Sequence, residues 1–230
     1  MQRRLLLASP TLLLAQSSTP PDIVQEMVGV SHRDPKRVRE ILDQQPGLVN
    51  ASIDWGFGDW ESALDAASHV GNREVAELLL SRGARPTIFS AAMLGQIDVV
   101  KNFIALQPGI QKTYGPHGIT LFAHARSPEL KEYLKTFGDA DNKLPSLPVS
   151  AEDKTRLSGN YTSSAGAFRV DVQNDRLGLA GPGIRSRVLI HDKGALNFYP
   201  AGAPWVSITF PQPGVLSIKG GALNLQAQRA

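Results

Sequence analysis

Apolar residues recur at two different spacings along this chain, and the spacing changes near residue 150. In the first part they follow the i, i+3, i+4 spacing of helices, as in VREIL, VAELLL, VVKNFI and LKEYL. After Asp153 they alternate with polar residues, as in AFRVDVQ (167–173) and WVSITF (205–210), which is the spacing of half-buried strands. The sequence therefore predicts an α+β fold of two domains, with helices first and strands second.

Short segments rich in small residues precede two of the leucine- and valine-rich helices. ESALDAASHVG (61–71) and TIFSAAMLG (87–95) each end in a glycine that can stop a helix. A small helix followed by a larger apolar helix cannot bury its apolar face alone, so we expect several such units to stack. The residues expected to be buried between helices are Ala67, Leu79, Ala91, Ala92 and Val99.

These units resemble the ankyrin repeat family. The positions that match its pattern are Ser62 to Asp65 at the start of the first helix, Ala67-Ser68 for its alanine pair, Gly71 at its end, and Leu78-Leu79 with Gly83-Ala84 at the end of the second helix. The resemblance covers about residues 22–141 and is strongest in the middle of that range. It implies an α-solenoid of helix pairs that binds a protein or peptide, since members of this family seldom catalyse a reaction.

The second part of the chain predicts a small antiparallel β-domain. Its short alternating runs are separated by turn signals such as Asn174-Asp175 and Gln212-Pro213-Gly214. This arrangement favours a barrel or a sandwich. The residues around Leu157, Gly159 and Tyr161 resemble the small β-domain appended to some penicillin-recognising serine hydrolases, in which the catalytic residues lie in the partner domain.

The patterns divide the chain into four segments. These are a signal peptide or poorly ordered tail (1–19), an ankyrin-repeat-like helical domain (20–141), a linker that contains Pro145 and Pro148 (142–153), and the β-domain (154–230). Arg3-Arg4 followed by the apolar run 5–15 fits a secretory signal peptide. The run is too short for a stable membrane span. We therefore expect a periplasmic or secreted protein if residues 1–17 are a signal peptide, and a cytoplasmic protein otherwise.

Composition and motifs narrow the possible chemistry. The net charge of +3 comes without a dense basic cluster, which argues against nucleic-acid binding. The chain has no cysteine, and this excludes disulfides, thiolate metal sites and cysteine nucleophiles. The standard catalytic and phosphate-binding motifs are absent. The five histidines, at positions 32, 69, 117, 124 and 191, lack metal-ligand spacing. The sequence thus predicts no catalytic residue, metal or cofactor.

Two long loops are the best candidates for a binding surface. The first, DWGFGDW (54–60), places large aromatic residues next to glycines, and aromatic residues on loops are common binding anchors. The second is IQKTYGPHG (110–118). The candidate partner-binding residues are Trp55, Phe57, Asp59, Tyr114 and His117. We expect Trp55 and Phe57 to be at least partly exposed, whereas Trp60, just before a helix start, should pack inward. The alternative is that the first loop folds back and covers the end of the stack.

The sequence as a whole favours a non-enzymatic protein that binds a protein or peptide through its ankyrin-like surface. The alternative is an enzyme or an enzyme-accessory protein, associated with a hydrolase, whose site lies between the helical domain and the β-domain.

Overall fold

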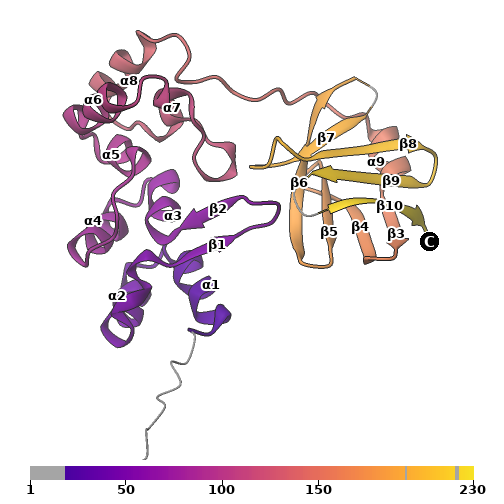
Figure 1. Cartoon of the computed structure of the whole chain (residues 1–230), viewed down its shortest axis with the longest axis horizontal. Coiled ribbons are helices and arrows are strands. Elements are labelled where there is room, and N and C mark those ends of the chain that lie inside the picture. Colours follow the sequence, from indigo (N-terminus) through magenta and orange to yellow (C-terminus); the bar gives the residue numbers. More distant parts are fainter. Residues whose placement is uncertain (1–18, 195, 221–222) are drawn as a thin grey trace, which may run out of the picture.

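The computed structural model describes residues 19–230, apart from residues 195 and 221–222, and comprises a helical region followed by a β-barrel (Figure 1). The helical region contains α1 (Pro21–Val30), α2 (Pro35–Gln44), α3 (Ala63–Val70), α4 (Arg73–Ser81), α5 (Ile88–Leu94), α6 (Ile97–Leu106), α7 (Leu121–His124) and α8 (Pro128–Lys135). The proposed signal segment, residues 1–17, lies outside the described residues. Its role stays a prediction.

Local sequence signals set where these helices begin and end. Ser62 and Thr87 each start a short helix with a capping box, in which the hydroxyl accepts a backbone N–H of the first turn. Gly71 and Gly95 end those helices in the left-handed conformation, with φ of 81° and 77°. Asn72 then caps α4. The repeated start and stop signals explain why α3, α4 and α5 form separate short helices.

The helical core lies between successive helices. α3 contacts α1, α4, α5 and α7, and α5 contacts α6 and α7. The prediction that Ala67, Leu79, Ala91 and Ala92 are buried is confirmed. The prediction for Val99 is wrong, because 40% of its surface is exposed and α6 instead buries Val100 and Ile104. Those two residues are one helical turn apart and share a face, which Val99 does not.

The β region closes into a barrel, so the sandwich alternative is excluded. Its strands are β3 (Gly159–Ser163), β4 (Gly166–Gln173), β5 (Arg176–Gly181), β6 (Ile184–Lys193), β7 (Asn197–Pro200), β8 (Ser207–Gln212), β9 (Val215–Gly220) and β10 (Leu223–Arg229). Each strand pairs antiparallel with the next, and β10 pairs with β3 to complete the barrel. Tyr161, Phe168 and Phe198 fill its interior. A helix that the sequence pattern did not predict, α9 (Ala151–Leu157), precedes β3 and is capped by Ser150.

Two segments connect the helical region to the barrel. The extended stretch before α9 lies along the barrel, where Leu147 pairs with His191 of β6 and the Tyr199 hydroxyl donates to the Pro145 carbonyl at 2.8 Å. A hairpin of β1 (Ser52–Asp54) and β2 (Trp60–Ser62) projects from the helical region towards the barrel (Figure 1). The place where this hairpin, the loop 113–119 and the barrel meet is called the junction below.

Candidate functional site

The β1–β2 hairpin determines which side chains face into the junction. Asp54 pairs with Trp60, and the Asp54 carboxylate accepts the backbone N–H of Gly56 at 2.8 Å and of Gly58 at 3.1 Å across the tight turn. Side chains alternate between the two faces of a strand, so Glu61 and Trp60 must point in opposite directions. Glu61 is fully buried and Trp60 is 62% exposed. The prediction that Trp60 packs inward is therefore wrong.

The aromatic residues of the hairpin tip contact this chain's own residues. Trp55 is partly buried, and its indole N–H donates to Glu61 Oε2 at 2.7 Å. Phe57 is also partly buried and packs against the apolar core of the barrel. The Phe57 carbonyl accepts the indole N–H of Trp205 at 3.0 Å. The first loop therefore contacts both the helical region and the barrel. These contacts differ from those expected if the loop only covered the end of the helices.

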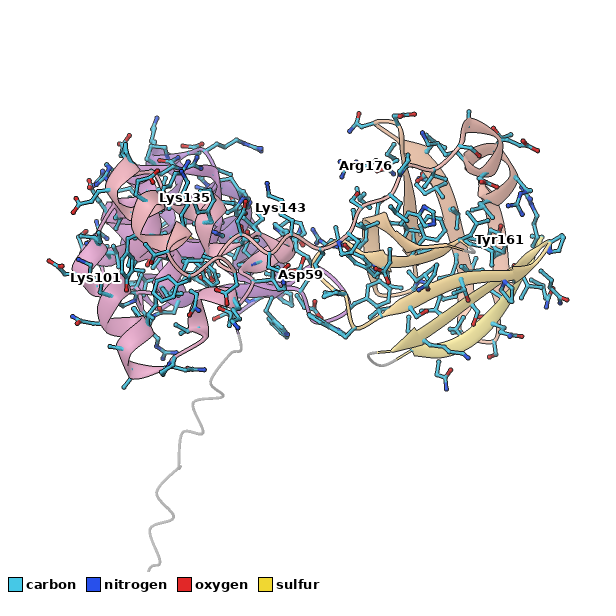
Figure 2. The ribbon with its side chains drawn as sticks, turned by 90° about the horizontal axis from the view of Figure 1, so that it is seen from above. Asp59, Lys101, Lys135, Lys143, Tyr161 and Arg176 are labelled. Atoms are coloured by element: carbon cyan, nitrogen blue, oxygen red, sulfur yellow. The ribbon has the colours of Figure 1, made fainter. Side chains whose placement is uncertain are left out.

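Asp59 links the hairpin to the loop before α7 and to the barrel. It is 3% exposed, and its carboxylate accepts the backbone N–H and the Nδ1–H of His117, both at 2.8 Å. The same carboxylate accepts a hydrogen bond from the guanidinium of Arg187 on β6. Figure 2 shows Asp59 where the helical region meets the barrel. Burial alone would raise the pKa of Asp59, but His117 and Arg187 outweigh it and hold that pKa below its ordinary value.

Three histidines and Glu61 converge beside Asp59. His69 Nε2 lies 2.9 Å from Glu61 Oε1, and His117 Nε2 lies 3.3 Å from the same oxygen. His32 Nε2 lies 3.7 Å from Glu61 Oε2 and 3.1 Å from His69 Nε2. The imidazole rings meet edge to face. These four residues, His32, Glu61, His69 and His117, are called the histidine–glutamate cluster below.

The cluster carries strong electrostatic coupling. Burial works to raise the pKa of Glu61, yet the neighbouring His117 and His69 lower it to about 2. Burial works to lower the pKa of His117, yet the Asp59 and Glu61 carboxylates raise it to about 9. Without a bound cation, the junction thus favours a negative carboxylate against a positive imidazole.

The structure brings together three histidines that their spacing in the sequence did not link. These histidines come from the end of α1, the last turn of α3 and the loop before α7, and they belong to no local motif. A signal was present, because His32 and His69 both lie at the ends of helices that precede a second helix, and those two helices, α1 and α3, contact one another. Glu61 was not selected as a candidate, although it is the centre of the cluster.

Two of the cavities that flank the junction bear on its chemistry. The first has a volume of about 330 Å³ and is bordered by Trp60, Phe89, Tyr114 and Trp205, with Asp65 also on its wall. It is called the aromatic groove below. The second, of about 340 Å³, adjoins the cluster and is lined by His32, Trp55, His117, Ser186, Arg187, Val188 and Ala201. Of the predicted site residues, Trp55, Asp59 and His117 therefore meet around the cluster, Tyr114 lies on the groove, and Phe57 faces the barrel.

A scan against protein-family models gave no match to this chain, and neither did a search of curated proteins. The resemblances to ankyrin repeats and to a hydrolase-associated β-domain therefore remain predictions. In the part of the chain that the structure describes, no helix has the length and apolar character needed to cross a bilayer. The chemistry of the junction is the basis for the functional proposals that follow.

Proposed function

We propose that this protein is a non-enzymatic binding protein that holds a protein or peptide segment in the aromatic groove. The observation that carries the proposal is the pair of tryptophans on the groove, Trp60 and Trp205, which are 62% and 57% exposed. Exposed apolar side chains that line one groove together are typical of an interaction site, and tryptophan is enriched among binding hot spots. One tryptophan comes from the hairpin and the other from the barrel.

The groove has the size and composition of a peptide subsite. Its volume of about 330 Å³ is at the lower end of the range for ligand pockets. Its wall combines four aromatic side chains with prolines and glycines, and Asp59, Asp65 and Thr87 supply a few polar groups. The indole of Trp205 is already fixed by its hydrogen bond to the Phe57 carbonyl, so less side-chain freedom is lost when a ligand binds. We infer that the groove receives one large apolar side chain of an extended segment.

A second candidate function is an enzyme, or an enzyme-accessory protein, whose site lies at the same junction. The observation that favours it is the histidine–glutamate cluster beside the second cavity. Among the described residues that line this cavity, Ser186 carries the one hydroxyl group, and that hydroxyl is hydrogen-bonded to Gln173 at 2.9 Å. Among these lining residues, no hydroxyl is hydrogen-bonded to a histidine that could activate it as a nucleophile. Binding is therefore the preferred function.

A peptide selection tests the binding function. A random-peptide display library is selected on the wild-type protein, and the enriched peptides are then titrated against purified variants. Trp60→Ala should weaken binding by about 2 kcal/mol, or roughly 30-fold in Kd. Leu106→Ala is the matched control, since Leu106 is 84% exposed on α6 and does not border the groove. Failure to enrich any peptide, or equal affinity for wild type and Trp60→Ala, would reject the proposal.

A further inference from the structure

When its imidazoles are neutral, the histidine–glutamate cluster contains more hydrogen-bond acceptors than donors. His32 Nδ1 lies 3.1 Å from the Val28 carbonyl oxygen, and His117 Nδ1 lies 2.8 Å from Asp59 Oδ2. A carbonyl or an ionised carboxylate can only accept, so in both rings the hydrogen belongs on Nδ1. When neutral, each ring presents the bare lone pair of Nε2 to the Glu61 carboxylate, at 3.7 Å for His32 and 3.3 Å for His117. A cation can take up both lone pairs and the carboxylate charge in place of a proton.

Glu61 has one oxygen that is close to the histidines but poorly bonded to them. Oε2 accepts the indole N–H of Trp55, whereas the buried Oε1 makes no well-directed hydrogen bond. Oε1 nevertheless lies within 3.3 Å of Nε2 of both His69 and His117. The nitrogen and oxygen atoms thus converge on a common space. Buried acceptors that face one another are costly, and a cation between them would satisfy all of them at once.

We propose that the Nε2 atoms of His32, His69 and His117 and one carboxylate oxygen of Glu61 bind a divalent transition-metal ion of the zinc class. The four ligand atoms lie within 4.8 Å of one another. A tetrahedral ion with bonds of about 2.0–2.1 Å holds its ligands roughly 3.3 Å apart. The close pairs in the cluster, at 2.9, 3.1, 3.3 and 3.7 Å, bracket that separation.

The types of ligand decide the class of ion. Three imidazoles suit zinc and its transition-metal neighbours, whereas calcium and magnesium require oxygen ligands. Four protein ligands complete a tetrahedron, which is the arrangement of structural zinc sites. This inference goes beyond the binding function proposed above, because the aromatic groove and the cluster are lined by different residues.

The surroundings of the cluster are those that metal-binding histidines need. Asp59 fixes the tautomer and the orientation of His117, and the Val28 and Gly29 carbonyls do the same for His32. Trp55 holds Glu61. Asp59 is in turn bonded to Arg187 of the barrel, so the barrel supports a site whose ligands all come from the helical region. A bound ion would therefore strengthen the junction as a whole.

Zinc titration of the full-length protein tests the site. The protein carries no polyhistidine tag, is stripped with EDTA, and is titrated with Zn²⁺ against a chromophoric chelator of known affinity. We expect one Zn²⁺ per chain with a submicromolar Kd. His69→Gln should weaken binding about 100-fold or more. His191→Gln should leave it unchanged, because His191 lies on β6 outside the cluster. Circular dichroism in EDTA checks that both variants fold.

X-ray absorption spectroscopy on the zinc-loaded wild-type protein identifies the metal ligands directly. This test does not depend on whether the variants fold. The expected spectrum shows nitrogen and oxygen ligands with the outer-shell scattering of about three imidazoles. Less than one Zn²⁺ bound per chain at micromolar concentration would overturn the proposal, and so would retention of binding by His69→Gln. In either case the cluster would be an ion-paired network that needs no metal.

Discussion

Replacing Glu61 by alanine is expected to lower the free energy of unfolding of the metal-free protein by about 3–5 kcal/mol. Glu61 is fully buried, and its carboxylate faces His32, His69 and His117. Removing it takes away one of the two carboxylates that face the partly buried His117 imidazole, and the indole N–H of Trp55 loses its acceptor. Both effects destabilise the folded state.

Urea denaturation at neutral pH in the presence of EDTA measures this effect. Glu77→Ala is the matched control, since Glu77 is more than half exposed and forms an i,i+4 ion pair with Arg73. Such surface pairs contribute less than about 1 kcal/mol. If the two alanine variants lose the same small amount of stability, Glu61 is not the centre of a charged, buried cluster.

Replacing Asp59 by alanine is expected to cost about 3–5 kcal/mol as well, for a different reason. The Asp59 carboxylate accepts hydrogen bonds from His117 of the helical region and from Arg187 of the barrel. Without it the Arg187 guanidinium is buried beside a carbonyl oxygen with no counter-charge. Separation of the barrel from the helical region would expose Arg187 to water and so lower the free energy of its unpaired charge.

Small-angle X-ray scattering detects that separation directly. The Asp59→Ala variant should show a larger radius of gyration than wild type, and its urea transition should lose the single cooperative step. Asp43→Ala is the control, because Asp43 pairs with Arg82 on the exposed surface and touches neither side of the junction. An unchanged radius of gyration together with wild-type stability would show that Asp59 does not hold the two parts together.

Local sequence signals were sufficient to predict most of the helices and the barrel strands, but not α9 or the β1–β2 hairpin. Ser62, Thr87, Gly71 and Gly95 act within one helical turn of where they occur, so their effect can be inferred without the fold. The closure of the barrel could not be predicted in this way. It depends on pairing between β3 and β10, the two ends of the β region, and alternation is the same in a sandwich.

The site was harder to predict than the fold because it is built from distant segments. His32, His69 and His117 lie in different helices and loops, and no spacing between them marks a ligand set. Trp60 and Glu61 show where a closer interpretation was possible. Once DWGFGDWES is taken as a hairpin, alternation requires one of the two to face inward, and the structure buries Glu61. The expectation that Trp60 packs inward as a hydrophobic staple ahead of the helix start led to the wrong choice.

The three tryptophans of the chain allow one measurement to test the central claim, that the junction is the functional site. Trp55 donates to Glu61 in the cluster, whereas Trp60 and Trp205 border the aromatic groove. In a two-dimensional ¹H–¹⁵N spectrum each indole N–H gives its own signal, assigned with single Trp→Phe variants. Zn²⁺ should move the Trp55 signal most, and a selected peptide should move the Trp60 and Trp205 signals. Ligands that bind while all three indole signals stay in place would contradict a functional junction.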